Sequence, residues 1–243
     1  MANKIPGRGF DPNDDRWFSN DALAMLKRGQ EEVQWLLDRG YRLDVVVPFI
    51  GNHYLLSARQ RLALQRTSAL SLQYEGRRNK MLSFEAAKDG CINIDGFNLI
   101  ITLEVALSKS IILLGTDGVI RDLAGLRGSY HIIEQTDNAL KLIGKCLKKL
   151  SVPKVKFYLD APVSNSGRLK SRILEHAVEW GMPVEAELVP NPDVILSELE
   201  RVVTSDSVIL DSCSSWFNLS RKIIEDYIAD AWVVSFERYD ATY

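Results

Sequence analysis

Hydrophobic residues in the first third of the chain recur at the three- and four-residue spacing of helices. A first helix is predicted from Ser19 or Asn20 to Gly40, because a polar cap precedes the pattern and a glycine ends it. Its apolar face consists of Leu23, Leu26, Val33, Leu36 and Leu37. The same spacing predicts a second helix from about Leu43 or Pro48, and a third from Ser57 to Tyr74. Residues 1–17, rich in Gly, Pro and Asp, are expected to form an irregular arm.

After residue 89 the pattern changes to short β-prone runs that alternate with helical stretches. The predicted strands are Cys91–Ile94, Ser110–Leu114, Val155–Leu159, Val184–Leu188, Ser207–Leu210 and Trp232–Phe236. The predicted helices are Asn138–Leu150, Ser166–Trp180, Asp193–Val203 and Asn218–Ile228. This alternation is typical of βαβ units. We therefore expect a Rossmann-like α/β domain with a mostly parallel sheet over residues 90–243, preceded by a small all-helical domain over residues 1–89.

Composition narrows the class of protein. The chain has 243 residues, of which 46% are hydrophobic and 26% charged, with a net charge of −2, so wholesale disorder is excluded. No apolar run approaches the ~18 residues of a membrane span, and the first ten residues lack the apolar core of a signal peptide. Cys91, Cys146 and Cys213 are too few and too far apart for a disulfide framework or a zinc knuckle. A cytoplasmic protein without a membrane partner is expected.

The small net charge conceals an uneven distribution. Residues 1–90 carry 14 Lys or Arg against 11 Asp or Glu, and residues 59–80 hold six basic residues against Glu75 alone. We predict that Arg59, Arg61 and Arg66 follow a nucleic-acid backbone, which would be a salt-sensitive and sequence-independent contact. An ordinary solvated helix face is the alternative.

Aspartates follow four of the predicted strands. They are Asp95, Asp117, Asp160 and Asp211. Carboxyl ends of parallel strands share one edge of a sheet, where ligands of α/β proteins bind. Clustered carboxylates repel one another unless a cation holds them, and Mg²⁺ or Mn²⁺ prefers such oxygen ligands. Helix capping is the alternative role for each of these aspartates.

The stretch from Ile94 to Ile100, which reads Ile-Asp-Gly-Phe-Asn-Leu-Ile, resembles the opening strand of the PIN/NYN-like nuclease superfamily. An acidic helix start at Asp193 and the segment from Thr204 to Ser212 also resemble that superfamily. The resemblance implies that Asp95, Asp193 and Asp211 bind a metal and that Asn98 supports them. Asp160 or Asp117 would complete the shell, and Asp206 competes with Asp211 for one role.

The loop from Asp160 to Arg168 combines small donors with a cation. Ser164, Asn165, Ser166 and Arg168 could grip a phosphate at a helix N-terminus beside Asp160. A proline-induced turn followed by a serine cap is the alternative.

The chain as a whole resembles a family of uncharacterised two-part prokaryotic proteins. The resemblance is carried by the stretch Gln60–Arg66, by the Ile-Asp-Gly-Phe-Asn motif, by Arg121–Gly125, by Asp160–Leu169 and by Trp216–Arg221. It implies no activity.

Together these features predict a Mg²⁺- or Mn²⁺-dependent nuclease, with RNA favoured over DNA. Its catalytic residues would be Asp95, Asp160, Asp193 and Asp211. Two alternatives stay open: a non-catalytic RNA- or protein-binding module with a degenerate acidic site, and a nucleotide phosphohydrolase. We also favour a homodimer, because small helical domains often bury apolar residues against a second copy.

Overall fold

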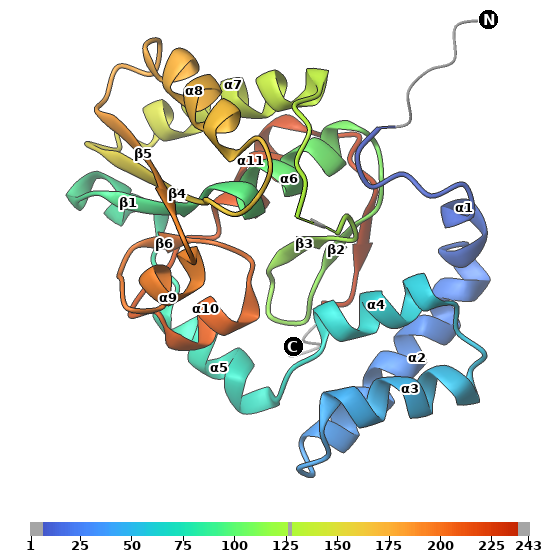
Figure 1. Cartoon of the computed structure of the whole chain (residues 1–243). Coiled ribbons are helices and arrows are strands. Elements are labelled where there is room, and N and C mark those ends of the chain that lie inside the picture. Colours follow the sequence, from blue (N-terminus) through green and yellow to red (C-terminus); the bar gives the residue numbers. More distant parts are fainter. Residues whose placement is uncertain (1–6, 126–127, 238–243) are drawn as a thin grey trace, which may run out of the picture.

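A computed structural model describes residues 7–125 and 128–237 (Figure 1). Its centre is a four-stranded sheet in the order β5-β4-β1-β6, and every pairing in this sheet is parallel. The strands are β1 (Ile92–Asp95), β4 (Val155–Asp160), β5 (Val184–Val189) and β6 (Val202–Val203). The predicted α/β class with a mostly parallel sheet is confirmed.

Helices cover both faces of this sheet. The alternation of β4 shows the two faces, since Val155, Phe157 and Leu159 enter one core and Tyr158 enters another. On the first face lie α6 (Gly96–Leu107), α7 (Glu134–Lys149), α8 (Ser166–Ala177) and α11 (Leu219–Tyr227). On the second lie α9 (Pro192–Ser197) and α10 (Ser207–Ser212), packed with the buried Trp216.

A second, three-stranded sheet links the two parts of the chain. It has the order β3-β2-β7, with β2 (Ile112–Leu114) antiparallel to β3 (Ile120–Asp122) and parallel to β7 (Val233–Ser235). Ile112 and Leu114 pack into the core around α6, whereas Ile111 and Leu113 pack against the N-terminal helices.

From residue 7 onward, the described N-terminal part contains a short 3₁₀ helix and five α-helices. They are α1 (Asp14–Trp17), α2 (Asn20–Leu37), α3 (Leu43–His53), α4 (Ala58–Thr67), α5 (Ser71–Lys80) and the 3₁₀ helix η1 (Phe84–Asp89). Leu26, Val33 and Leu64 share one hydrophobic core with Val234 of β7 and with Phe236, which follows that strand. The N-terminal helices therefore complete their core against β2 and β7. In Figure 1, α4 is the helix of this group that lies beside β2.

Three predicted elements are corrected. The predicted third helix is two, because the chain leaves α4 at an extended Ser68. The predicted strand Ser207–Leu210 is helix α10, which Asp206 caps by accepting from the Val208 and Ile209 N–H groups. The true strand, β6, lies inside the stretch predicted as a helix up to Val203.

The predicted irregular arm contains the short helix α1, and residues 1–6 of that arm lie outside the described residues. Within the described parts of the chain, no helix is both long and apolar enough to cross a membrane.

Candidate functional site

Asp95 ends the central strand β1 and begins helix α6. Its Oδ1 accepts the Asn98 N–H at 3.3 Å, so the carboxylate caps the helix. Its Oδ2 accepts the Thr204 hydroxyl at 2.9 Å. Only 7% of the residue is exposed, so Asp95 is a buried carboxylate fixed on both oxygens.

The loop that follows β6 meets this carboxylate from the neighbouring strand. β1 pairs with β6 through Ile94 and Val203, so Thr204 lies next to Asp95 in register. The Thr204 hydroxyl accepts the Asp206 N–H at 3.1 Å. Ser205 donates its N–H and its hydroxyl to Oδ1 of Asn98, at 2.8 and 2.9 Å. β1 is followed by α6 on one face of the sheet, and its neighbour β6 is followed by α10 on the other face. Ligands of α/β proteins bind at such a switch point, at the carboxyl ends of the strands.

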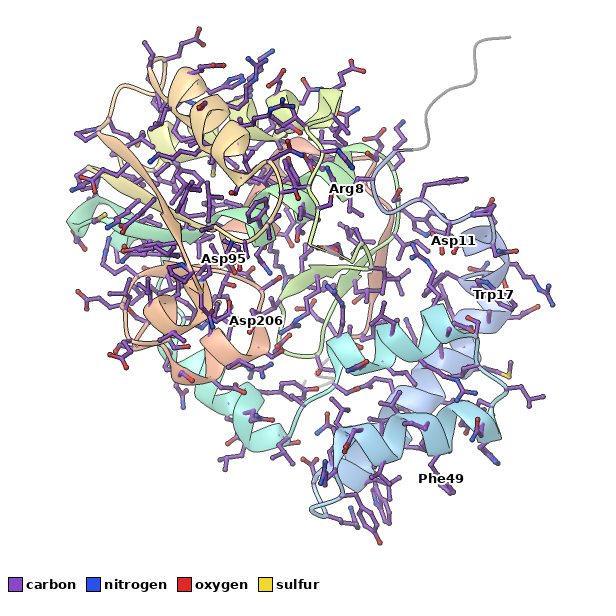
Figure 2. All side chains as sticks on the ribbon, viewed as in Figure 1. Arg8, Asp11, Trp17, Phe49, Asp95 and Asp206 are labelled. Carbon is purple, nitrogen blue, oxygen red and sulfur yellow. The ribbon has the colours of Figure 1, made fainter. Side chains whose placement is uncertain are left out.

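Asp160 and Asp193 complete an acidic edge at the carboxyl ends of the strands. Asp160 is the last residue of β4, the other neighbour of β1. Asp193 lies in the first turn of α9, which Asn191 caps by accepting the Asp193 N–H at 3.0 Å. In Figure 2 Asp95 and Asp206 lie close together at the ends of the strands. We call Asp95, Asp160, Asp193 and Asp206 the acidic edge.

The electrostatics of the acidic edge show that its carboxylates interact. Burial raises the pKa of Asp95 to about 7, and the charges of Asp193 and Asp206 add to the rise. The pKa of Asp193 is also raised, by burial and then by Asp206 and Asp160. Burial raises the pKa of Asp160. Bringing a cation to this edge would relieve the repulsion.

Two of the predicted metal ligands do not join the acidic edge. Asp211 lies on α10, where its Oδ1 accepts from Arg77 Nε at 2.6 Å and its Oδ2 from Gln73 at 2.7 Å. Asp117 lies in the turn between β2 and β3 and is held by Arg77 and Arg121 at 2.7 Å each. Burial alone would raise the pKa of Asp117, but these two guanidinium groups hold it below its usual value. The structure thus groups Asp206, rather than Asp211, with Asp95.

Thr204 and Ser205 are not among the predicted site residues, because the strand is predicted to lie after them. The available signal was the pair Val202–Val203, which is followed directly by three polar residues. A short apolar run is ambiguous between helix and strand, so the strand is predicted at Ser207–Leu210 instead of at Val202–Val203.

The loop predicted to bind a phosphate makes some of its polar contacts within the chain. Asn165, which has a positive φ of 67°, donates from Nδ2 to the Tyr130 carbonyl at 2.7 Å. The Ser166 hydroxyl donates to the Ala161 carbonyl at 3.4 Å, and Ser166 is buried. Ser164 and Arg168 are exposed, so they are the side chains of this loop open to a ligand.

Each of the predicted nucleic-acid-binding arginines has a partner within the chain. Arg59 pairs with the buried Asp14 at 2.5 Å. Arg61 donates to the Leu56 carbonyl at 2.9 Å and to Asn52 at 2.9 Å. Arg66 donates to the Asp122 carbonyl at 3.0 Å. These contacts tie the N-terminal helices to one another and to β3. Binding of nucleic acid by these arginines stays a prediction.

Comparison with known proteins follows the two parts of the chain. Residues 84–222 match the family described as "Domain of unknown function (DUF5616)", which covers more than half of the chain. The chain belongs to the DUF5616 family. Residues 25–80 of this DUF5616 protein match "Protein of unknown function (DUF434)". The DUF5616 protein is also 35% identical over 206 residues to "Uncharacterized protein MJ0935" of Methanocaldococcus jannaschii, which covers 85% of this chain and 96% of that protein.

No solved structure matches the DUF5616 protein at a significant level. Neither family description nor the relative's name gives an activity, so the resemblance to PIN/NYN-like nucleases stays a prediction.

Proposed function

We propose that the acidic edge binds Mg²⁺ or Mn²⁺ and hydrolyses phosphodiester bonds, with RNA as the first substrate to test. The observation that carries the proposal is Asp95, a carboxylate fixed on both oxygens beside Asp193 and Asp206. Burying a carboxylate among other carboxylates is costly unless a cation is bound there or the group serves chemistry.

The donor chemistry of the acidic edge fits a hard divalent cation, since every side chain offers carboxylate oxygen. In the structure of residues 7–125 and 128–237, no three His, Cys, Asp or Glu side chains are already arranged as a ready cage. Mg²⁺ does not require one, because it usually keeps several waters and uses one or two carboxylates. Asp95 with Asp193 or Asp206 would hold the ion, which supplies Lewis-acid polarisation and a more acidic bound water.

The chain's own residues have separate roles in this proposal. Thr204 and the N–H of Asn98 stabilise the ionised form of Asp95 and fix its direction. Asp193 is exposed and Asp160 half-buried, so the edge is open to a long substrate. Arg168, exposed in the first turn of α8, is a cation that a substrate phosphate could contact.

The alternative is a module whose acidic edge is degenerate and binds RNA or protein without cleavage. The lack of a ready three-ligand group in the described residues favours this alternative. A nucleotide phosphohydrolase would use the same carboxylates.

Mn²⁺ titration of four proteins tests the proposal: wild type, Asp95→Asn, Asp206→Asn and Asp230→Asn. The last is the control, because Asp230 is exposed and pairs with Lys109 beyond the C-terminal end of α6, whereas Asp95 caps the other end of that helix. We expect binding and cleavage of a labelled single-stranded RNA to fall for Asp95→Asn and Asp206→Asn only. A wild type that neither binds Mn²⁺ nor cleaves RNA would refute the proposal. Binding without cleavage of RNA would favour the degenerate module, and hydrolysis of mononucleotides alone would favour the phosphohydrolase.

A further inference from the structure

A buried chain of charges runs from the N-terminal helices to the loop that holds Asp95. Asp211 pairs with Arg77 of α5 at 2.6 Å, and Arg77 Nη1 pairs with Asp117 at 2.7 Å. Asp117 accepts two bonds from Arg121, at 2.9 and 2.7 Å. Arg121 Nε then donates to the Ser205 carbonyl at 3.0 Å. Segments far apart in sequence are thereby joined by charge-assisted bonds.

The side chains in the middle of this chain of charges are almost completely buried. Side-chain exposure is 2% for Arg77, 1% for Asp117 and 5% for Arg121. Desolvating such charges is costly, and only mutual pairing with well-aligned hydrogen bonds offsets the cost. Fully paired networks in a dry environment are rigid, because each member would lose its partner on moving.

Ser205, at the end of the chain of charges, transmits this rigidity to the acidic edge. Its carbonyl is held by Arg121, while its N–H and hydroxyl hold Oδ1 of Asn98. Thr204, one residue before, donates to Asp95, and Asp206, one residue after, belongs to the acidic edge. Any shift of the Ser205 peptide therefore moves Thr204, which donates to Asp95, and Asp206, whose charge acts on Asp95.

We propose that Arg121 is a positioning residue of the acidic edge, which it serves by fixing the Thr204–Asp206 loop from behind. Through Asp117 it extends this support to Arg77, so that helix α5 of the N-terminal part belongs to the machinery of the site. The role in cation binding rests on the function proposed above, whereas the fixing of the loop does not.

Arg201 offers a matched control. It also donates to backbone carbonyls, with Nη2 to Ala86 at 2.8 Å and Nε to Cys91 at 3.2 Å. It precedes β6, however, whereas Arg121 holds the loop that follows this strand. Replacing Arg201 should loosen the amino-terminal side of the sheet and leave the acidic edge intact.

The experiment compares wild type, Arg121→Lys, Arg121→Met and Arg201→Met. Lysine keeps the charge beside Asp117, but its single ammonium cannot replace both the fork on Asp117 and the bond to Ser205. This variant keeps the test valid should Arg121→Met fail to fold.

Amide hydrogen exchange of Ser205 and Asp206 is the first readout. Loss of a charge-assisted bond is expected to speed exchange roughly tenfold to a hundredfold in both Arg121 variants, and not in Arg201→Met. Unchanged exchange in Arg121→Lys, or an equal increase in Arg201→Met, would overturn the positioning role.

Mn²⁺ affinity of the folded proteins is the second readout. Changes to residues that orient metal ligands cost about 10–100-fold in affinity, so we expect that loss in the Arg121 variants alone. Equal Mn²⁺ affinity in all four proteins would show that Arg121 does not position the acidic edge. If wild type binds no Mn²⁺, the proposed function fails, and hydrogen exchange still decides whether Arg121 fixes the loop.

Discussion

The Thr204 hydroxyl donates to Oδ2 of Asp95 at 2.9 Å and at the same time accepts the N–H of Asp206 at 3.1 Å. The Thr204 side chain thus orients the buried carboxylate of Asp95 and also fixes the backbone of Asp206, the next carboxylate of the acidic edge. A hydrogen bond to the charged form of an acid favours ionisation, so Thr204 opposes the effect of burial on Asp95.

Replacing Thr204 with valine should therefore weaken cation binding. We expect Thr204→Val to raise the pKa of Asp95 further and to lower Mn²⁺ affinity about 10–100-fold. Calorimetric titration at pH 7 measures this change. Thr204→Ser retains the hydroxyl and should restore most of the affinity. If both variants bind like wild type, Thr204 does not prepare Asp95 for a cation.

Asp95 should make the protein less stable as pH rises. Its pKa in the folded protein, about 7, lies above the ordinary value of 3.8. Between these values the folded state binds more protons than the unfolded state, so the free energy of unfolding falls with rising pH and levels off above pH 7. For a pKa shift of this size, the free energy of unfolding falls by on the order of 4 kcal/mol in total.

Urea unfolding of wild type and Asp95→Asn at pH 4 and pH 8, without divalent cations, measures this effect. Asparagine keeps the oxygen that caps α6 and cannot ionise. The variant should be clearly more stable than wild type at pH 8 and differ little at pH 4. A difference that does not depend on pH would contradict the raised pKa.

Arg77 should be important for stability, although it lies in a helix rich in exposed residues. Arg77→Met removes a partner of Asp117, which is 1% exposed, and the partner of Asp211. Breaking a buried ion pair on one side costs about 3–5 kcal/mol. Arg42→Met, which removes an exposed pair with Asp44, is the control and should leave the free energy of unfolding nearly unchanged. Similar losses in both variants would show that the buried pairs of Arg77 stabilise the fold no more than the exposed pair of Arg42.

The predicted homodimer would use the outer face of α2 and α3. Trp35 and Phe49 are 55% and 65% exposed there, an unusual amount of aromatic surface. We expect Phe49→Glu to shift a dimer to a monomer in light scattering after size-exclusion chromatography. Val178→Glu, at an even more exposed apolar position after α8, is the control and should leave the mass unchanged. A monomeric wild type would disprove the homodimer.

Local pattern was sufficient for three of the four strands of the parallel sheet, β1, β4 and β5, and for two members of the acidic edge. Asp95 and Asp160 follow apolar runs that form β1 and β4, and the carboxyl ends of parallel strands must share an edge. Most helices of both parts could likewise be predicted from spacing and caps, because these depend on residues three or four positions apart.

Tertiary structure alone decided which charges are free. Asp211 and Asp206 are both acidic residues near a short apolar run, but Arg77 reaches Asp211 from α5 and neutralises it, whereas Asp206 interacts with Asp95 and Asp193. Arg59, Arg61 and Arg66 carry the charge expected of a nucleic-acid-binding helix, and each is bound within the chain. Contacts such as Arg59 with Asp14, 45 positions apart, and Arg77 with Asp211, 134 positions apart, leave no periodic trace in the sequence, so only the fold could assign these roles.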